Sequence, residues 1–203
     1  MGLALISVSS TALVIRYVSI VPALTLAFWR MLSASFLLWL YSLIKKQTPL
    51  SLINKKRIVF AGVFLGLHFA CFFLGVRYTS IANATLLATL GPVFTSIISF
   101  FQGKKTSRNV YFGLAVALFG IIIIQYGDLS LSPKNLLGNA LSLLSSFFIA
   151  VTFTTAAEIR KDTDNVSYGR TLFLIAAITI GLIATISGVS LISFQKNHIL
   201  WLL

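Results

Sequence analysis

The chain has 203 residues, of which 58% are hydrophobic and only 10% are charged, and its mean hydropathy is +0.97. Soluble domains carry about 25% charged residues and are less apolar, so the composition excludes an ordinary soluble domain and predicts an integral membrane protein. The net charge of +12 comes mostly from Lys and Arg in short gaps between apolar runs; no separate domain remains to bind nucleic acid.

About seven apolar runs follow one another, and most approach the roughly 20 residues that a spanning helix needs. They lie near 3–21, 23–44, 58–77, 81–101, 110–126, 136–157 and 171–192. Several are rich in β-branched residues, but an isolated strand in lipid would leave its backbone groups unpaired. The sequence therefore predicts an all-α polytopic membrane protein with about seven transmembrane helices.

Positive charge is concentrated in alternate gaps, after the second, fourth and sixth runs. These gaps contain Lys45, Lys46, Lys55, Lys56, Arg57, Lys104, Lys105, Arg108, Arg160 and Lys161. The other gaps hold few cations, namely Arg16, Arg77 and Lys134. Because cytoplasmic loops carry the excess of Lys and Arg, we expect these three gaps and the N-terminus to face the cytoplasm, with the chain in the cell (inner or plasma) membrane.

The chain also repeats itself. GLALISVSS at 2–10 resembles GNALSLLSS at 138–146, and a looser match places Arg30 opposite Arg170. The period of roughly 136–140 residues contains five runs, and an odd number of spans would give the two copies opposite orientations in the membrane. Inverted-topology repeats are a recurring architecture of secondary transporters.

This periodicity predicts an inverted repeat of five-helix units, of which the second is incomplete. We expect residues 1–127 to form the first unit and residues 136–203 to begin the second, which is truncated. The terminal KNHILWLL, at 196–203, is typical of the start of a further apolar run.

The stretch FFLGVRYTSIANATLLATLGPVFTSIISFFQGKKTSRNVYFGLAVALFGIIII, residues 72–124, resembles the EamA-type drug/metabolite transporter superfamily. It has that family's helix start, its mid-helix proline, its basic loop and its G-x6-G helix. AFWRML and GNALSLLSSFFIAVTFTTAAEIRK resemble the family's second helix and the opening of its second repeat. The resemblance implies roughly ten helices in two inverted halves that export or import small metabolites. This chain departs from the pattern in lacking about three C-terminal helices and the acidic residue that often closes the basic loop.

A helix breaker and a polar stripe interrupt the fourth run. Five residues at alternating steps of four and three share one helical face: Thr85, Thr89, Pro92, Ser96 and Ser99. Pro92 cannot donate to the carbonyl of Ala88, and Gly91 weakens the same turn. One interpretation is a bent helix that lines a translocation path, with Gly91 and Pro92 as its hinge. The alternative is close helix packing, because small polar residues are common at helix contacts in membranes.

Three polar residues within or beside the apolar runs are candidates for the path. Arg30 would attract an anionic group of a substrate or anchor an outer gate; its alternative role is a structural tie to carbonyls or headgroups. His68 would relay a proton, but no intramembrane carboxylate accompanies it, so a packing role is the alternative. Asn83, at the start of the fourth run, would cap that helix or meet the substrate.

Further path candidates come from the third and sixth runs. Phe72, with Phe69 and Phe73, would stack on an aromatic or cationic substrate or simply pack. Ser142, Ser145 and Thr152 share one face of the sixth run, and this face would line the path or form a close-packing seam. Gly62 and Gly66 form a G-x-x-x-G pattern, which is typical of helix contacts.

The sequence predicts a secondary transporter of a small organic metabolite or drug-like compound, in the efflux direction, working by alternating access. The alternative is a non-transporting truncated paralogue or a membrane assembly partner. Signatures of zinc proteases, serine hydrolases and P-loop enzymes are missing, so we expect no enzyme, no metal site and no cofactor. The expected partners are the lipid bilayer and a small-molecule substrate, with a coupling proton, a homodimer or a completing segment as further candidates.

Overall fold

The computed structural model describes residues 2–45, 47, 49–104, 107–126 and 132–192, without the side chains of 2–9 and 124–126. Its helices are α1 (Gly2–Tyr17), α2 (Ala23–Ile44), α3 (Leu52–Tyr78), α4 (Ile81–Ala88), α5 (Gly91–Phe101), α6 (Arg108–Tyr126), α7 (Pro133–Ile159) and α8 (Asn165–Ile186). Across these residues there is no strand, which confirms the expected all-α fold. Residues 193–203, the end of the predicted second unit, lie outside the described part.

Each predicted run corresponds to one helix, except that the fourth is divided into α4 and α5. Five segments of the described chain are long and apolar enough to cross a membrane: α2, α3, α4 with α5, α7 and α8. The predicted starts of α3 and α8, at 58 and 171, were several residues late. Ser51 accepts from the N–H of Asn54 and Asp164 accepts from that of Ser167, so polar caps begin both helices before their apolar stretches do.

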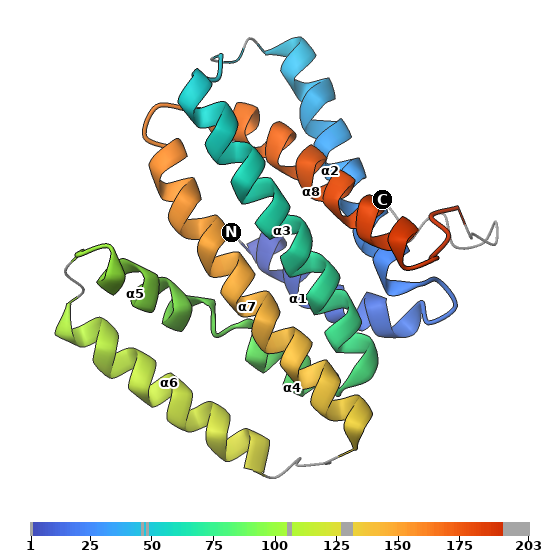
Figure 1. Ribbon diagram of the computed structural model, residues 1–203, viewed down its shortest axis with the longest axis vertical. Helices are drawn as coiled ribbons and strands as arrows, with labels where there is room; N and C mark the ends of the chain where they lie inside the picture. Colours follow the sequence, from blue (N-terminus) through green and yellow to red (C-terminus); the bar gives the residue numbers. More distant parts are fainter. Residues whose placement is uncertain (1, 46, 48, 105–106, 127–131, 193–203) are drawn as a thin grey trace.

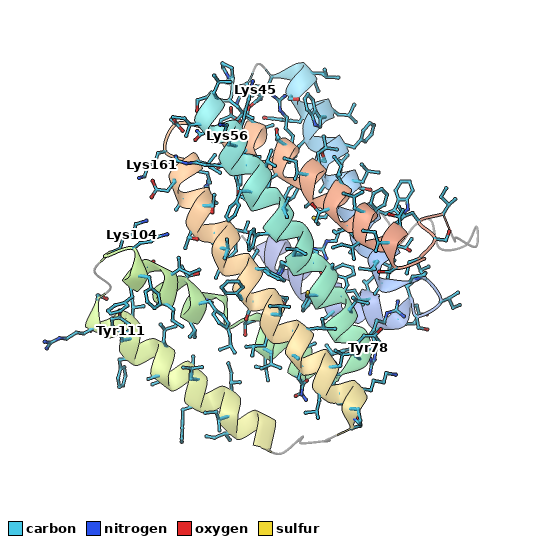
Figure 2. All side chains as sticks on the ribbon, viewed as in Figure 1. Lys45, Lys56, Tyr78, Lys104, Tyr111 and Lys161 are labelled. Atoms are coloured by element: carbon cyan, nitrogen blue, oxygen red, sulfur yellow. The ribbon has the colours of Figure 1, made fainter. Side chains whose placement is uncertain are left out.

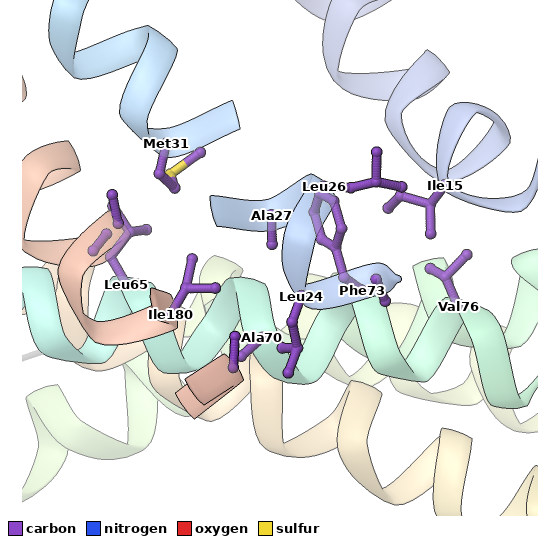
Figure 3. Packing of buried hydrophobic residues seen from close by; sticks show 14 of the residues in the cluster. Ile15, Leu24, Leu26, Ala27, Met31, Leu65, Ala70, Phe73, Val76 and Ile180 are labelled. Atoms are coloured by element: carbon purple, nitrogen blue, oxygen red, sulfur yellow. The ribbon is translucent and has the colours of Figure 1, made fainter. Parts of the chain in front are cut away.

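The helix α3 lies at the centre of the arrangement (Figure 1). It packs along α7 on one side and along α8 on the other, and α2 packs against α8. α4 and α5 both pack against α7, while α6 lies at the outer edge. Figure 3 shows apolar side chains of α2, among them Leu24, Ala27 and Met31, packed with Leu65 of α3 and Ile180 of α8.

Glycines allow α3 to approach both neighbours closely. A Cβ atom on Gly66 would lie 2.7 Å from the Cβ of Thr179 and 2.9 Å from the carbonyl oxygen of Ala176, both in α8. Gly62 faces Ile175 of α8 in the same way, so the G-x-x-x-G pattern does mark a helix contact. Membrane helices associate through such close packing, because lipid provides no hydrophobic drive between them.

The basic connections lie at one end of the helices. Figure 2 shows Lys45, Lys56, Lys104 and Lys161 along the upper and left edge of the view, while Tyr78 lies at the lower right. Two interactions tie these connections together: Lys104 Nζ lies 3.3 Å from Glu158 Oε1, and Asn54 Nδ2 donates to Asp162 Oδ1 over 2.6 Å. Lys46 and Lys105 lie outside the described residues.

The helices that carry the internal repeat run in opposite directions. α1 ends beside the last turn of α3, where Arg16 Nη1 donates to the carbonyl of Val76 over 2.9 Å. α7 begins at that same end, since Gly138 packs against Thr79. α2 and α8 are antiparallel too, because Thr25 near the start of α2 donates to the carbonyl of Ser190 after α8. An inverted repeat requires these orientations, and its boundaries stay a prediction.

Replacing Gly66 by Leu is expected to lower the free energy of unfolding by about 1–3 kcal/mol, because the added side chain overpacks the α3–α8 contact. Gly120→Leu is the matched control, since nothing lies within 4 Å of a Cβ atom at that position. Both variants should be compared by denaturant unfolding of the purified protein in detergent. An equal loss in the two variants would show that the contact does not depend on Gly66.

Candidate functional site

A charged and aromatic cluster lies between α1, α2 and α3. Arg30 Nη1 of α2 donates to Thr11 Oγ1 of α1 over 2.6 Å, and its guanidinium carbon lies 5.8 Å from the ring centroid of Phe69 in α3. The ring of His68 is 4.9 Å from that of Phe69 and is stacked on that of Phe72 at 6.1 Å, with 5° between the planes. We call Thr11, Arg30, His68, Phe69 and Phe72 the Arg30 cluster.

The core packing of α2 fixes the position of Arg30. Leu24, Ala27 and Met31 are buried at 4%, 0% and 3% exposure, and their spacing places them on one face of α2. Arg30 precedes Met31 and is itself half-buried, so it lies at the edge of the buried face. A charged group therefore lies beside the apolar face, about two turns inside the helix.

His68 connects the Arg30 cluster to α7. Its Nδ1 lies 2.8 Å from the carbonyl oxygen of Ser145. A carbonyl oxygen only accepts hydrogen bonds, so Nδ1 carries a proton here and, in the neutral ring, Nε2 is an acceptor. Ser145 is thus a hydrogen-bond partner of His68 in α7, and no bond to Nε2 is found within the described part of the chain, so this nitrogen could accept one from a ligand.

Ser142, Ser145 and Thr152 lie in the α3–α7 contact, with exposures of 0%, 0% and 2%. The Ser142 hydroxyl donates to the carbonyl of Gly138 and the Ser145 hydroxyl to that of Ser142. Thr152 Oγ1 donates to the carbonyl of Phe148 over 3.0 Å, within α7. These placements favour the close-packing seam over the path-lining role.

The interruption predicted in the fourth run is present. α4 ends at Ala88 and α5 begins at Gly91, with Pro92 in the first turn of α5. Val93 donates its N–H to the carbonyl of Leu90 over 2.9 Å, while Pro92 has no N–H for the carbonyl of Ala88. A Cβ on Gly91 would lie 3.2 Å from Ile149 Cγ2, so the break rests on α7.

The polar stripe around this break does not join the Arg30 cluster through any described hydrogen bond or ring contact. The hydroxyls of Thr85 and Thr89 donate to carbonyls of α4 itself, those of Ile81 and Leu86. Thr89 and Pro92 are exposed. Ser96 lines an apolar groove of about 460 Å³ between α5 and α6, formed by Val93, Ser96, Ile97, Phe100, Tyr111, Leu114, Ala115 and Leu118.

Asn83 does not cap α4, so that alternative was wrong. Ser80 is the cap, and its hydroxyl accepts from the N–H of Asn83 over 3.1 Å. Asn83 is only 4% exposed, and its buried Oδ1 has no hydrogen-bond partner among the described residues. The same holds for Thr79 Oγ1 and Asn139 Oδ1. Asn83 is the third residue of α4, so its N–H receives the capping bond and its side chain is not in the cap position.

Two arginines tie α1 to α3, a pairing that the sequence did not reveal. Arg16 Nη1 at the end of α1 donates to carbonyls at the end of α3, of which Val76 is the nearest. Arg77 in the last turn of α3 donates to the carbonyls of Val18, Ser19 and Val21 over 2.6–2.7 Å. Each arginine thus donates to carbonyls at or just after the end of the other helix. The C-terminal end of a helix is a favourable place for a cation. We call this pair the arginine tie.

Comparison with known proteins identifies the family. Residues 1–126 match the EamA-like transporter family, so the chain belongs to that family. It is 25% identical over 154 residues to an uncharacterized transporter of Helicobacter pylori strain J99, covering 72% of this chain and 50% of that protein. It is 30% identical over 115 residues to the pseudopaline exporter CntI of Pseudomonas aeruginosa strain PAO1, covering 56% and 40%. The chain spans about half the length of the curated relatives it matches, and no solved structure matches it.

Replacing Arg77 by Gln is expected to lower the free energy of unfolding by about 1–3 kcal/mol, because the carbonyls of Val18, Ser19 and Val21 lose a charged donor. Amide hydrogen exchange of residues 17–23 should become faster. Arg108→Gln, at the exposed start of α6, is the control and should change neither quantity. Unchanged exchange in the Arg77 variant would show that the arginine tie does not order the α1–α2 connection.

Proposed function

We propose that this chain, as a member of the EamA-like transporter family, works as a secondary transporter that moves a small organic metabolite or drug-like compound by alternating access. Family membership and the transporter names of its relatives support the transporter class. The efflux direction is supported by one relative that is named an exporter. The observation that carries the mechanism is the break between α4 and α5.

A helix broken inside a span supplies both a hinge and free backbone groups. Discontinuous helices form the substrate and ion sites of many secondary transporters. Here the carbonyl of Ala88 lacks its usual donor, because the residue four positions on is Pro92, and unpaired backbone is tolerated in a membrane only inside protein or beside water. We propose that Gly91 and Pro92 are the hinge at which α5 changes its angle against α7.

The proposed path runs between the Arg30 cluster and the two halves of the broken helix. Its candidate lining comprises Arg30, His68, Phe72, Asn83, Thr85, Thr89, Pro92 and Ser96. Ser142, Ser145 and Thr152 lie in the α3–α7 contact, and we propose that this contact holds His68 at the side of the path. A proton remains a candidate coupling ion, with His68 as its carrier.

We further propose that residues 1–127 and 136–203 belong to two inverted units, and that the basic end of the bundle faces the cytoplasm of a cell with the chain in its inner or plasma membrane. The antiparallel courses of α1 against α7 and of α2 against α8 support the inversion. The concentration of Lys and Arg at one end supports the orientation, because cytoplasmic loops carry this excess.

Replacing Pro92 by Ala is expected to slow substrate efflux about tenfold, equivalent to ~1.4 kcal/mol, at unchanged protein abundance. Alanine supplies the missing N–H and allows α4 and α5 to form one straight helix. Pro133→Ala is the matched control, because Pro133 is in the first turn of α7, where the missing N–H has no helical partner.

The transported compound for this assay would be found by comparing metabolites released by cells that express the chain and by cells that do not. Equal metabolite profiles would contradict the transporter proposal and leave the assembly partner as the better explanation. Equal efflux by the Pro92 and Pro133 variants would contradict the hinge alone.

The orientation can be tested with single-cysteine variants made in a Cys71→Ala chain, since Cys71 is the only cysteine. Lys56→Cys and Lys161→Cys are expected to react with a membrane-impermeant maleimide only after the cells are opened. Lys134→Cys, at the start of α7, is expected to react in intact cells. Reaction of Lys56→Cys and Lys161→Cys from opposite sides would contradict the inverted arrangement.

A further inference from the structure

The arginines at the helix ends and the arginine inside a span have different surroundings. Arg16 and Arg77 each donate to three backbone carbonyls. Arg30 donates one described hydrogen bond, to the neutral hydroxyl of Thr11. Its other guanidinium N–H groups have no acceptor among the described residues, although a guanidinium presents a whole fork of donors.

The acidic residues of the described chain are engaged elsewhere. Glu158 pairs with Lys104 at 3.3 Å and with Lys161 at 2.6 Å. Asp162 accepts from Asn54, and Asp164 accepts from the first N–H groups of α8. All three carboxylates lie at the basic end of the helices. Arg30 lies near the start of α2, which is at the opposite end. Arg30 therefore has no anionic partner among the described residues.

A charge inside a membrane span is costly unless an opposite charge or strong acceptors accompany it. The face of the Phe69 ring gives some compensation to Arg30, because aromatic rings attract cations. A single hydroxyl and one ring are weaker partners than the six carbonyl bonds of the arginine tie. The surroundings of Arg30 are thus those of a binding group whose anionic partner is not among the described residues.

We propose that Arg30 binds a carboxylate of the transported molecule and that the rings of Phe69, His68 and Phe72 receive an aromatic or planar part of the same molecule. A carboxylate matches the fork of a guanidinium in a bidentate pair. The Phe69 ring contacts both Arg30 and His68, so the anion and the ring of one small ligand would lie side by side. That the bound molecule is also transported rests on the proposed function, whereas its binding is tested separately.

The test uses three small probes of matched shape: phenylacetate, its neutral amide phenylacetamide, and the cation phenethylamine. Equilibrium binding of each labelled probe would be measured on the purified chain in lipid nanodiscs. The unaltered protein is expected to bind phenylacetate at least about tenfold more tightly than either other probe, which corresponds to ~1.4 kcal/mol. Equal binding of the probes, tighter binding of phenethylamine, or no saturable binding of phenylacetate would overturn the proposal.

Variants then assign the preference to Arg30. Arg30→Gln is expected to reduce phenylacetate binding to the level of phenylacetamide, whereas Arg30→Lys should keep part of the preference because it keeps the charge but not the fork. Arg170→Gln is the matched control, since Arg170 also lies over an aromatic ring, that of Trp39 at 4.3 Å, but near the basic end. Loss of the preference in the Arg170 variant, or its retention in Arg30→Gln, would contradict the assignment.

The binding step and the transport step fail in different ways. If vesicles carrying the chain release neutral or cationic solutes and the protein does not bind phenylacetate, the anion site is wrong and the transporter stands. If phenylacetate binds through Arg30 and nothing is transported, the anion site stands and the transporter proposal is wrong.

Discussion

The structure depends on the satisfaction of polar backbone groups in a medium that offers them no water. An unpaired carbonyl in lipid costs several kcal/mol, so each place where a helix ends or breaks needs a partner from the protein. The arginine tie provides these partners where α1 and α3 end. The break between α4 and α5 rests on α7, where the side chain of Ile149 lies close to Gly91 and covers the backbone without offering it a hydrogen bond. Close contacts of α3 with α7 and α8 then shield the remaining backbone of these helices from lipid.

The same constraint gives the charged residues different kinds of partner. At the basic end, Lys104 and Lys161 are exposed and pair with Glu158. At the opposite end, Arg16 and Arg77 donate hydrogen bonds to backbone carbonyls. Arg30 belongs to neither group, because it lies within α2 with one hydroxyl and one ring as described partners. Arg16 and Arg77 show how this fold satisfies a cation that has a structural role, and the surroundings of Arg30 differ from theirs.

Much of the fold follows from the sequence, and the site follows from it only in part. Apolar runs and the Gly91–Pro92 pair predict the helices and the break, because lipid permits few alternatives for such segments. Run length misplaced the starts of α3 and α8, since their capped first turns are polar. The contact of Arg30 with Phe69 joins different helices, so no local pattern encodes it. Ser142 and Ser145 stayed ambiguous because small polar residues serve equally in a path and in a packing seam.

One turn of α7 connects the ligand-binding candidate to the break. His68 donates to the carbonyl of Ser145, and one turn further along α7 the side chain of Ile149 faces Gly91 at the start of α5. A ligand that drew His68 away from Ser145 would remove the hydrogen bond that this carbonyl accepts beside the helical one, and it would change the packing of α3 against the turn of α7 on which the broken helix rests. A ligand that left this hydrogen bond intact would leave the turn unchanged. If the proposed site and hinge are coupled through this turn, the ligand must reach past Arg30 to the imidazole, and a lone anion at Arg30 would bind without moving α5.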